Sequence, residues 1–258
     1  MPPRASISGW LWGAVALTAA KLWLTSGQTL FAIGPAIHDD RLFVELAGHL
    51  VRGEWLGPYN QYTLAKGPMF PLFIAAMFWL GLPLMLAQQL LYAGACAAVT
   101  RALAPWVRPA AAQFSLYALL LCNPMSYEAG NLSRLMRQNL YTPLGLLVIA
   151  GLVWLFARRR ESWRRQAVPA ALAGLALGGF WLTREESVWL LPAVGLLLVG
   201  LAASLGRELR ERWRPLSASV ALLTLAALLP FLIICSLNQR HYGWFGTVEF
   251  QSREFKAA

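Results

Sequence analysis

Charged residues are scarce in this chain: Asp, Glu, Lys and Arg make up 13% of its 258 residues, about half the share of a soluble domain. Hydrophobic residues make up 58%, which excludes an ordinary soluble domain and is typical of a polytopic membrane protein. Acidic residues are rarer than basic ones, so the formal net charge is +10. Because the arginines lie in short blocks between apolar segments, this charge indicates membrane topology and no nucleic-acid partner.

Cysteines are few, and their spacing fits neither a metal site nor a disulfide framework. Cys96, Cys122 and Cys235 lie in separate apolar stretches, as small buried residues do. Patterns that bind nucleotide phosphates are missing, which disfavours a sugar nucleotide as substrate. The first apolar run has no cleavage-site pattern, so we expect it to remain as an anchor.

Long apolar runs occupy most of the chain. A spanning helix needs about 20 residues, and the candidates are residues 7–24, 68–82, 84–104, 109–123, 140–157, 167–182, 187–205 and 216–237. The arginine blocks at 158–165 and 207–214 should face the cytoplasm. If every segment crossed and Arg4 were inside, both blocks would be outside. One segment must therefore not cross, and 68–82 is the best candidate because it is short and flanked by prolines.

The sequence thus predicts an all-α polytopic membrane protein with about seven transmembrane helices and two outer-face juxtamembrane helices. The membrane module covers residues 1–237, and its outer loop, 25–83, holds the juxtamembrane helices at 40–53 and 68–82. Residues 238–258 form an outer-face tail. The N-terminus is then cytoplasmic, and the arginine-rich inner loops suit a bacterial inner membrane. Lys21, near the outer end of the first span, should snorkel toward water.

The helix predicted at 40–53 is amphipathic. Leu42, Leu46 and Leu50 recur at the spacing of one helical face, while Glu45 and His49 take the other. Beside long apolar segments, a short helix of this kind is typical of the membrane interface, where we expect it to lie.

Asp39 and Asp40 precede this helix and are the candidate catalytic residues. Asp is a favoured N-cap, so one or both could simply cap the helix. Alternatively, one carboxylate faces the interface as a general base or a metal ligand. His38 completes a possible ligand set for a divalent metal ion, although one His beside two Asp is a weak signature.

Other polar residues face the same side in this topology. Arg134 and Arg137 are three residues apart and should share a helix face, where they either anchor to lipid headgroups or hold a phosphate. Arg184 belongs either to an exposed ion-paired turn or to the same site. Lys66 and Glu128 are either ordinary interfacial residues or further members of that site.

The order of these features resembles the C-type (GT-C) membrane glycosyltransferases. An N-terminal span is followed by the Asp39-Asp40 loop, an amphipathic helix, and a Lys66-x-Pro68-x-x-Pro71 run that opens an apolar helix. The likeness is to the dolichyl-phosphate-mannose–protein mannosyltransferase and lipid A aminoarabinose transferase group, and it covers roughly the whole chain. In that family an Asp of the first outer loop is the catalytic carboxylate, a position that Asp39 or Asp40 matches.

The resemblance implies further site residues. Glu128 matches an acidic position in the second outer loop, and Lys66 matches a basic position near the donor phosphate. The chain departs from the family at Gly67, where Pro is more frequent, and at Glu128, where Asp is usual. Family members continue beyond the position of Ala258 with further spans or an outer domain, so the resemblance concerns the N-terminal module.

The function that the resemblance implies is sugar transfer from a polyprenyl-phosphate carrier to a hydroxyl on a lipid, glycan or protein at the outer face. Asp39 or Asp40 would accept the proton of the attacking hydroxyl. The leaving phosphate would be stabilised by a divalent metal ion or by the basic residues Lys66, Arg134, Arg137 and Arg184.

Two other classes stay open. One is a catalytically inactive or truncated scaffold or lipid-binding subunit. The other is a transporter or flippase, which is disfavoured because the charges gather at one face rather than at mid-membrane.

Overall fold

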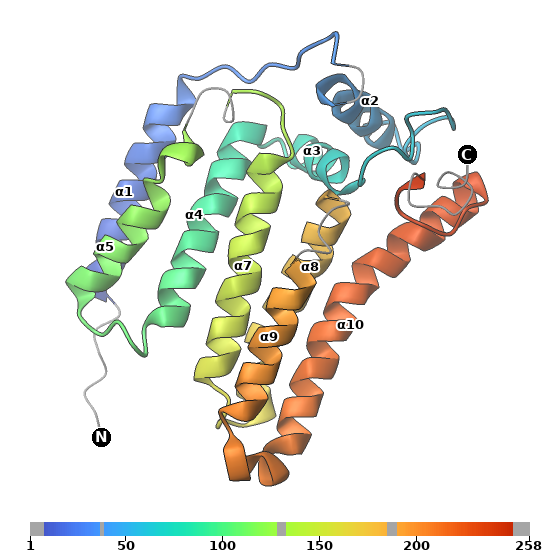
Figure 1. Ribbon diagram of the computed structural model, residues 1–258. Coiled ribbons are helices and arrows are strands. Elements are labelled where there is room, and N and C mark those ends of the chain that lie inside the picture. Colours follow the sequence, from blue (N-terminus) through green and yellow to red (C-terminus); the bar gives the residue numbers. More distant parts are fainter. Residues whose placement is uncertain (1–7, 37–38, 128–132, 185–189, 250–258) are drawn as a thin grey trace.

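The computed structural model describes residues 8–36, 39–127, 133–184 and 190–249, and this part of the chain is helical without a β-strand. Most of the helices lie side by side in a bundle (Figure 1): α1 (Ser8–Ser26), α4 (Leu84–Leu103), α5 (Ala110–Leu121), α7 (Gln138–Ala157), α8 (Trp163–Thr183), α9 (Leu190–Ala203) and α10 (Leu209–Tyr242). The 3-10 turns are η1 (Pro124–Ser126) and η3 (Gly206–Glu208). The predicted all-α class is confirmed.

Two further helices, α2 (Asp40–Val51) and α3 (Met69–Trp79), lie at one end of the bundle, close to the C-terminal end of α10 (Figure 1). We refer to this as the α2–α3 end. The arginine-rich segments 158–165 and 207–214, which comprise short turns and the first residues of α8 and α10, lie at the opposite end. Both short helices are smaller than predicted: α2 stops before Gly53, whose φ of +78° ends it, and α3 stops before Leu80.

Several helices are suited to a membrane. Within the described residues, α7, α8 and the segment Gly206–Tyr242 are each long and apolar enough to cross one, and α3 with α4 would make a fourth candidate if the bent pair counts as one span. Helices α5 and α9 are apolar but have only 12 and 14 residues. At about 1.5 Å per residue both fall short of the hydrocarbon core. Length and composition therefore support a membrane protein without establishing the number of spans predicted from the arginine blocks.

The chain bends by 112° between α3 and α4. Gly81 has a φ of +66°, in the left-handed region that favours glycine, and Pro83 occupies the N-cap of α4. This bend explains why α3, the core of the predicted 68–82 segment, does not run along the bundle beside α4.

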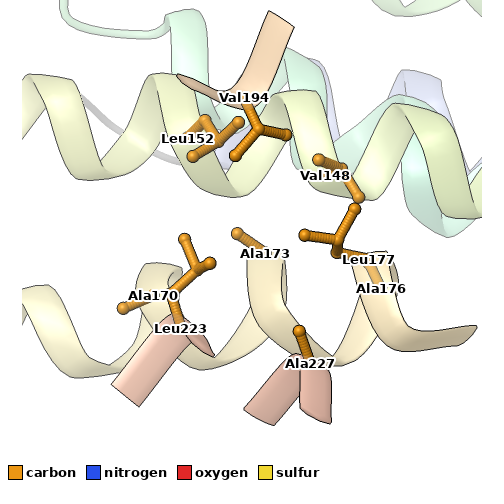
Figure 2. Close-up of a cluster of buried hydrophobic side chains, with 9 residues drawn as sticks. All are labelled: Val148, Leu152, Ala170, Ala173, Ala176, Leu177, Val194, Leu223 and Ala227. Carbon is orange, nitrogen blue, oxygen red and sulfur yellow. The ribbon is translucent and has the colours of Figure 1, made fainter. Parts of the chain in front are cut away.

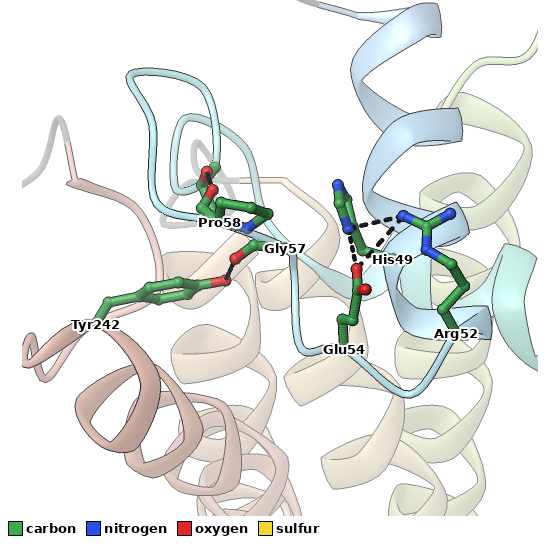
Figure 3. A network of polar contacts seen from close by, with 7 residues as sticks. His49, Arg52, Glu54, Gly57, Pro58 and Tyr242 are labelled. Atoms are coloured by element: carbon green, nitrogen blue, oxygen red, sulfur yellow. Dashed lines mark hydrogen bonds and ion pairs between the residues drawn. The ribbon is translucent and has the colours of Figure 1, made fainter.

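The apolar face of α2 packs on protein. Leu42, Leu46 and Leu50 are buried in a cluster with Ala75 of α3, and Tyr242 at the end of α10 packs against this cluster. The Tyr242 hydroxyl also donates a 2.8 Å hydrogen bond to the Gly57 carbonyl, in the loop after α2 (Figure 3). The predicted interfacial helix is therefore amphipathic as expected, but neighbouring helices cover the face that was expected to meet lipid.

The main core lies where α7, α8, α9 and α10 meet (Figure 2). Small residues of α8 let α10 approach closely: a Cβ on Gly174 would lie 2.3 Å from the Leu223 carbonyl oxygen, and one on Gly178 would lie 2.5 Å from that of Ala227. This Gly-x-x-x-Gly pair is a frequent means of packing helices within membranes.

We expect Gly174→Ala to lower the free energy of unfolding by about 1–3 kcal/mol, because the added methyl must push α10 away. The matched control is Gly195→Ala in α9, where an added Cβ meets nothing within 4 Å and alanine favours the helix by roughly 0.5–1 kcal/mol. Denaturant unfolding in micelles compares the two variants. Equal stability of both would contradict the close α8–α10 contact.

Candidate functional site

Asp40 is a buried carboxylate held by an arginine from a distant loop. Nε of Arg134 lies 3.1 Å from Oδ1 and 2.9 Å from Oδ2 of Asp40, and the Ile33 amide donates a 2.9 Å hydrogen bond to Oδ2. The Asp40 side chain has 0% exposed surface. A buried charge of this kind needs such partners. The hydrogen bond with Asp40 also raises the pKa of Arg134.

Backbone pairing reinforces the same connection. The Phe31 amide donates to the Ser133 carbonyl at 2.8 Å, and the Leu135 amide donates to the Phe31 carbonyl at 3.0 Å, which makes an isolated parallel bridge between Phe31 and Arg134. The segment that follows α1 is thereby tied to the segment that precedes α7. Asp40 and Arg134 form the side-chain part of this connection.

Asp39 has different surroundings from its neighbour. It occupies the N-cap position of α2, yet its side chain makes no capping hydrogen bond, so side-chain capping, one of the two alternatives, is wrong for this residue. Oδ1 of Asp39 lies 3.7 Å from Nζ of Lys66, and the Asp39 side chain is 45% exposed. Asp39 is therefore the accessible carboxylate of the pair.

Lys66 stands in a loop that lies directly on the C-terminal end of α8. A Cβ on the next residue, Gly67, would lie 2.2 Å from the Leu182 carbonyl oxygen. This close approach accounts for glycine at position 67, because any other residue carries a Cβ that would collide with α8.

Arg137 and Arg184 meet at the same end of α8. Nη1 of Arg137 lies 3.4 Å from the Thr183 carbonyl oxygen, and the guanidinium of Arg184 lies over the Tyr141 ring, 5.0 Å from its centroid. Cations there complement the negative end of the helix. The prediction that Arg134 and Arg137 share a helix face is wrong, because α7 begins only at Gln138 and the two side chains bind different partners.

The predicted metal site has only one suitable member among the described residues. His38 and Glu128, two of the predicted site residues, lie outside the described part of the chain. Both oxygens of Asp40 accept hydrogen bonds from Arg134, which disfavours metal binding there. Within the described ranges, no group of three or more His, Cys, Asp or Glu side chains gathers around a point. Asp39 alone remains as a candidate ligand.

Lys21 points inward rather than snorkelling as expected. It is 6% exposed, and Nζ donates to the Leu121 carbonyl at 2.8 Å and to Ser126 Oγ at 2.7 Å. Its ammonium also lies 4.7 Å from the centre of the Tyr92 ring. Lys21 therefore joins α1 to the end of α5 and to α4, close to the α2–α3 end.

The structure thus brings four predicted basic residues and both aspartates to the α2–α3 end, in two groups. Asp40 pairs with Arg134, whereas Asp39, Lys66, Arg137 and Arg184 lie around the loop before α3 and the end of α8. No protein-family model, curated protein or solved structure matches the chain. Its function has to be inferred from these side chains.

We expect Asp40→Asn to lower the free energy of unfolding by about 1–3 kcal/mol, because Arg134 loses its charged partner in a buried setting. Glu45→Gln is the matched control: Glu45 pairs with Arg41 at 2.6 Å on the exposed face of α2, and such pairs contribute less than about 1 kcal/mol. Thermal unfolding measures both. Faster hydrogen exchange at the Phe31 and Ile33 amides of Asp40→Asn would locate the loss, and an unchanged stability would contradict the structural role.

Proposed function

We propose that the protein is an integral-membrane glycosyltransferase that moves a sugar from a polyprenyl-phosphate carrier to a hydroxyl acceptor on a lipid, glycan or protein. One observation carries this proposal: of two adjacent aspartates, Asp40 is buried in an ion pair and Asp39 is half-exposed beside Lys66. Asp39 is thus accessible to a substrate, whereas Asp40 is engaged in a structural ion pair. This difference favours Asp39 over Asp40 as the general base.

The reaction needs only one displacement. Asp39 accepts the proton of the acceptor hydroxyl while the hydroxyl oxygen bonds to the anomeric carbon of the sugar. The bond between that carbon and the phosphate oxygen breaks, and the phosphate leaves with the electron pair. Attack from the side opposite the phosphate inverts the anomeric centre.

Positive charge at the leaving phosphate is the second requirement. The Lys66 ammonium lies 3.7 Å from the proposed base, and Arg137 and Arg184 lie at the nearby end of α8. Cations fixed in this way stabilise developing negative charge on a phosphate. A divalent ion bound at Asp39 would supply the same kind of charge.

We further propose that the spans are α1, α4, α5, α7, α8, α9 and α10, with α2 and α3 at the outer face. Successive members of this set alternate in direction along the chain (Figure 1). The arginine-rich turns then face the cytoplasm, in keeping with the positive-inside rule. The candidate site faces the opposite compartment, which in a bacterial inner membrane is the periplasm.

We expect Asp39→Asn to reduce sugar transfer roughly a hundred- to ten-thousandfold, the usual contribution of a general base. Because Asp39 is half-exposed, thermal stability should change little. Transfer from a synthetic polyprenyl-phosphate sugar to an acceptor extract measures the effect, and Glu45→Gln serves as the exposed carboxylate control on α2. Full activity of Asp39→Asn would reject Asp39 as the base.

An inactive scaffold or lipid-binding subunit is the alternative, and the same assay separates it. Such a protein would retain the polyprenyl phosphate without transferring sugar, in the wild type and in every variant. A transporter has less support: among the described residues, the predicted site residues at the α2–α3 end lie at helix termini and in loops, and the Arg41–Glu45 pair lies on the exposed face of α2.

Sidedness is testable with single cysteines in a protein whose Cys96, Cys122 and Cys235 are replaced by alanine. Glu54→Cys, in the loop after α2, should react with a membrane-impermeant maleimide in intact spheroplasts. Glu208→Cys, in η3, should react only after permeabilisation. Both native side chains are substantially exposed. Labelling of both positions from one side would overturn the proposed spans.

A further inference from the structure

A cavity of about 120 Å³ that is lined by amide and apolar side chains lies between α4, α7 and η1 at the α2–α3 end of the bundle. Its amide groups come from Gln88 and Gln89 on α4, Gln138 and Asn139 on α7, and Asn123 before η1. A single water needs roughly 10–15 Å³ of such space. The cavity therefore has room for a ligand with several polar groups.

Several side-chain amide atoms of the cavity glutamines make no hydrogen bond to the described residues. Gln88 is 1% exposed and Gln89 is 4% exposed. Both polar atoms of the Gln88 amide, and Oε1 of Gln89 and of Gln138, have no hydrogen-bond partner within the described part of the chain. An unsatisfied buried polar group costs roughly 1–3 kcal/mol. Apolar side chains would be more stable at these positions, so the amides are better explained by a ligand that pairs with them.

We propose that this cavity binds the ring of an uncharged sugar. Primary amides both donate and accept hydrogen bonds, as sugar hydroxyls do, so each amide can satisfy a hydroxyl in either direction. Charged residues are absent from the described lining. No carboxylate belongs to the described lining to pair with an amino sugar. Lys21 adjoins the lining residues Ser126 and Tyr92, but it already donates hydrogen bonds to the Leu121 carbonyl and to Ser126. A charged sugar would thus give up its hydration for less than a full counter-charge, which favours a neutral ring.

The cavity adjoins the cationic group at the end of α8. Tyr141 lines the cavity, and its ring carries the guanidinium of Arg184 at 5.0 Å. A sugar in the cavity would therefore lie close to Arg184, one of the residues proposed to hold phosphate. The choice of a sugar as ligand rests on the proposed function. The cavity adds to that function the class of sugar, a neutral one, and the amide residues that recognise it.

The test uses the full chain in nanodiscs with D-glucose, D-galactose and D-mannose as probes, and with D-glucosamine and D-glucuronate as charged comparisons. Saturation-transfer NMR at millimolar concentration should detect at least one neutral hexose and neither charged sugar. Gln88→Leu should weaken this binding roughly tenfold or more, the equivalent of about one lost hydrogen bond. The control is Gln113→Leu, which makes the same change near the start of α5, away from the cavity. Gln113 donates a hydrogen bond to the Val107 carbonyl there, and this variant should bind the hexose normally.

Gln138→Met provides a second variant should Gln88→Leu fail to fold, with the same expected loss of binding. Two results would overturn the proposal: no hexose binding to the wild type, or binding that both variants leave unchanged. In either case the cavity holds water only. Asp39→Asn distinguishes this inference from the proposed function, because it should retain hexose binding while losing transfer. If the wild-type protein transfers sugar but binds no free hexose, the sugar-binding role of the cavity is rejected and the proposed function stands.

Discussion

The α2–α3 end of the molecule depends on the ion pair between Asp40 and Arg134. A fully buried carboxylate is unfavourable unless its charge and its hydrogen-bonding capacity are satisfied, and here Arg134 and the Ile33 amide satisfy both. The pair fixes the start of α2 against the segment that leads into α7. Because Asp39 is the neighbouring residue, its position beside Lys66 follows from this anchor. The buried ion pair thus positions the neighbouring carboxylate that we propose as the general base.

Much of the architecture could be predicted from local signals. Prolines and glycines bounded the 68–82 segment, and Gly81 with Pro83 indeed turns the chain between α3 and α4. The spacing of Leu42, Leu46 and Leu50 correctly identified the apolar face of α2. The partner of that face could not be predicted, because Tyr242 lies nearly two hundred residues away and one sequence holds no record of such contacts.

The sequence offered candidate site residues but not their arrangement. Asp39 and Asp40 look alike in the sequence, and only their tertiary partners, Lys66 and Arg134, tell them apart. The helical spacing of Arg134 and Arg137 was misleading because α7 starts after both residues. The adjacent glutamines 88 and 89 were a signal that sequence reasoning missed, since two amides inside an apolar helix are costly unless something pairs with them.

The packing of Tyr242 and Trp244 against α2 has a consequence for biogenesis. Ribosomes deliver the chain from its N-terminus, so α2 is made long before the end of α10 exists. Until then the leucine stripe of α2 is only partly covered, and an amphipathic helix in that condition rests on the lipid headgroups. The amphipathic pattern of α2, which predicts an interfacial helix, would then describe the protein during synthesis. Once α10 is made and packs against α2, α2 would leave the bilayer surface for its final position.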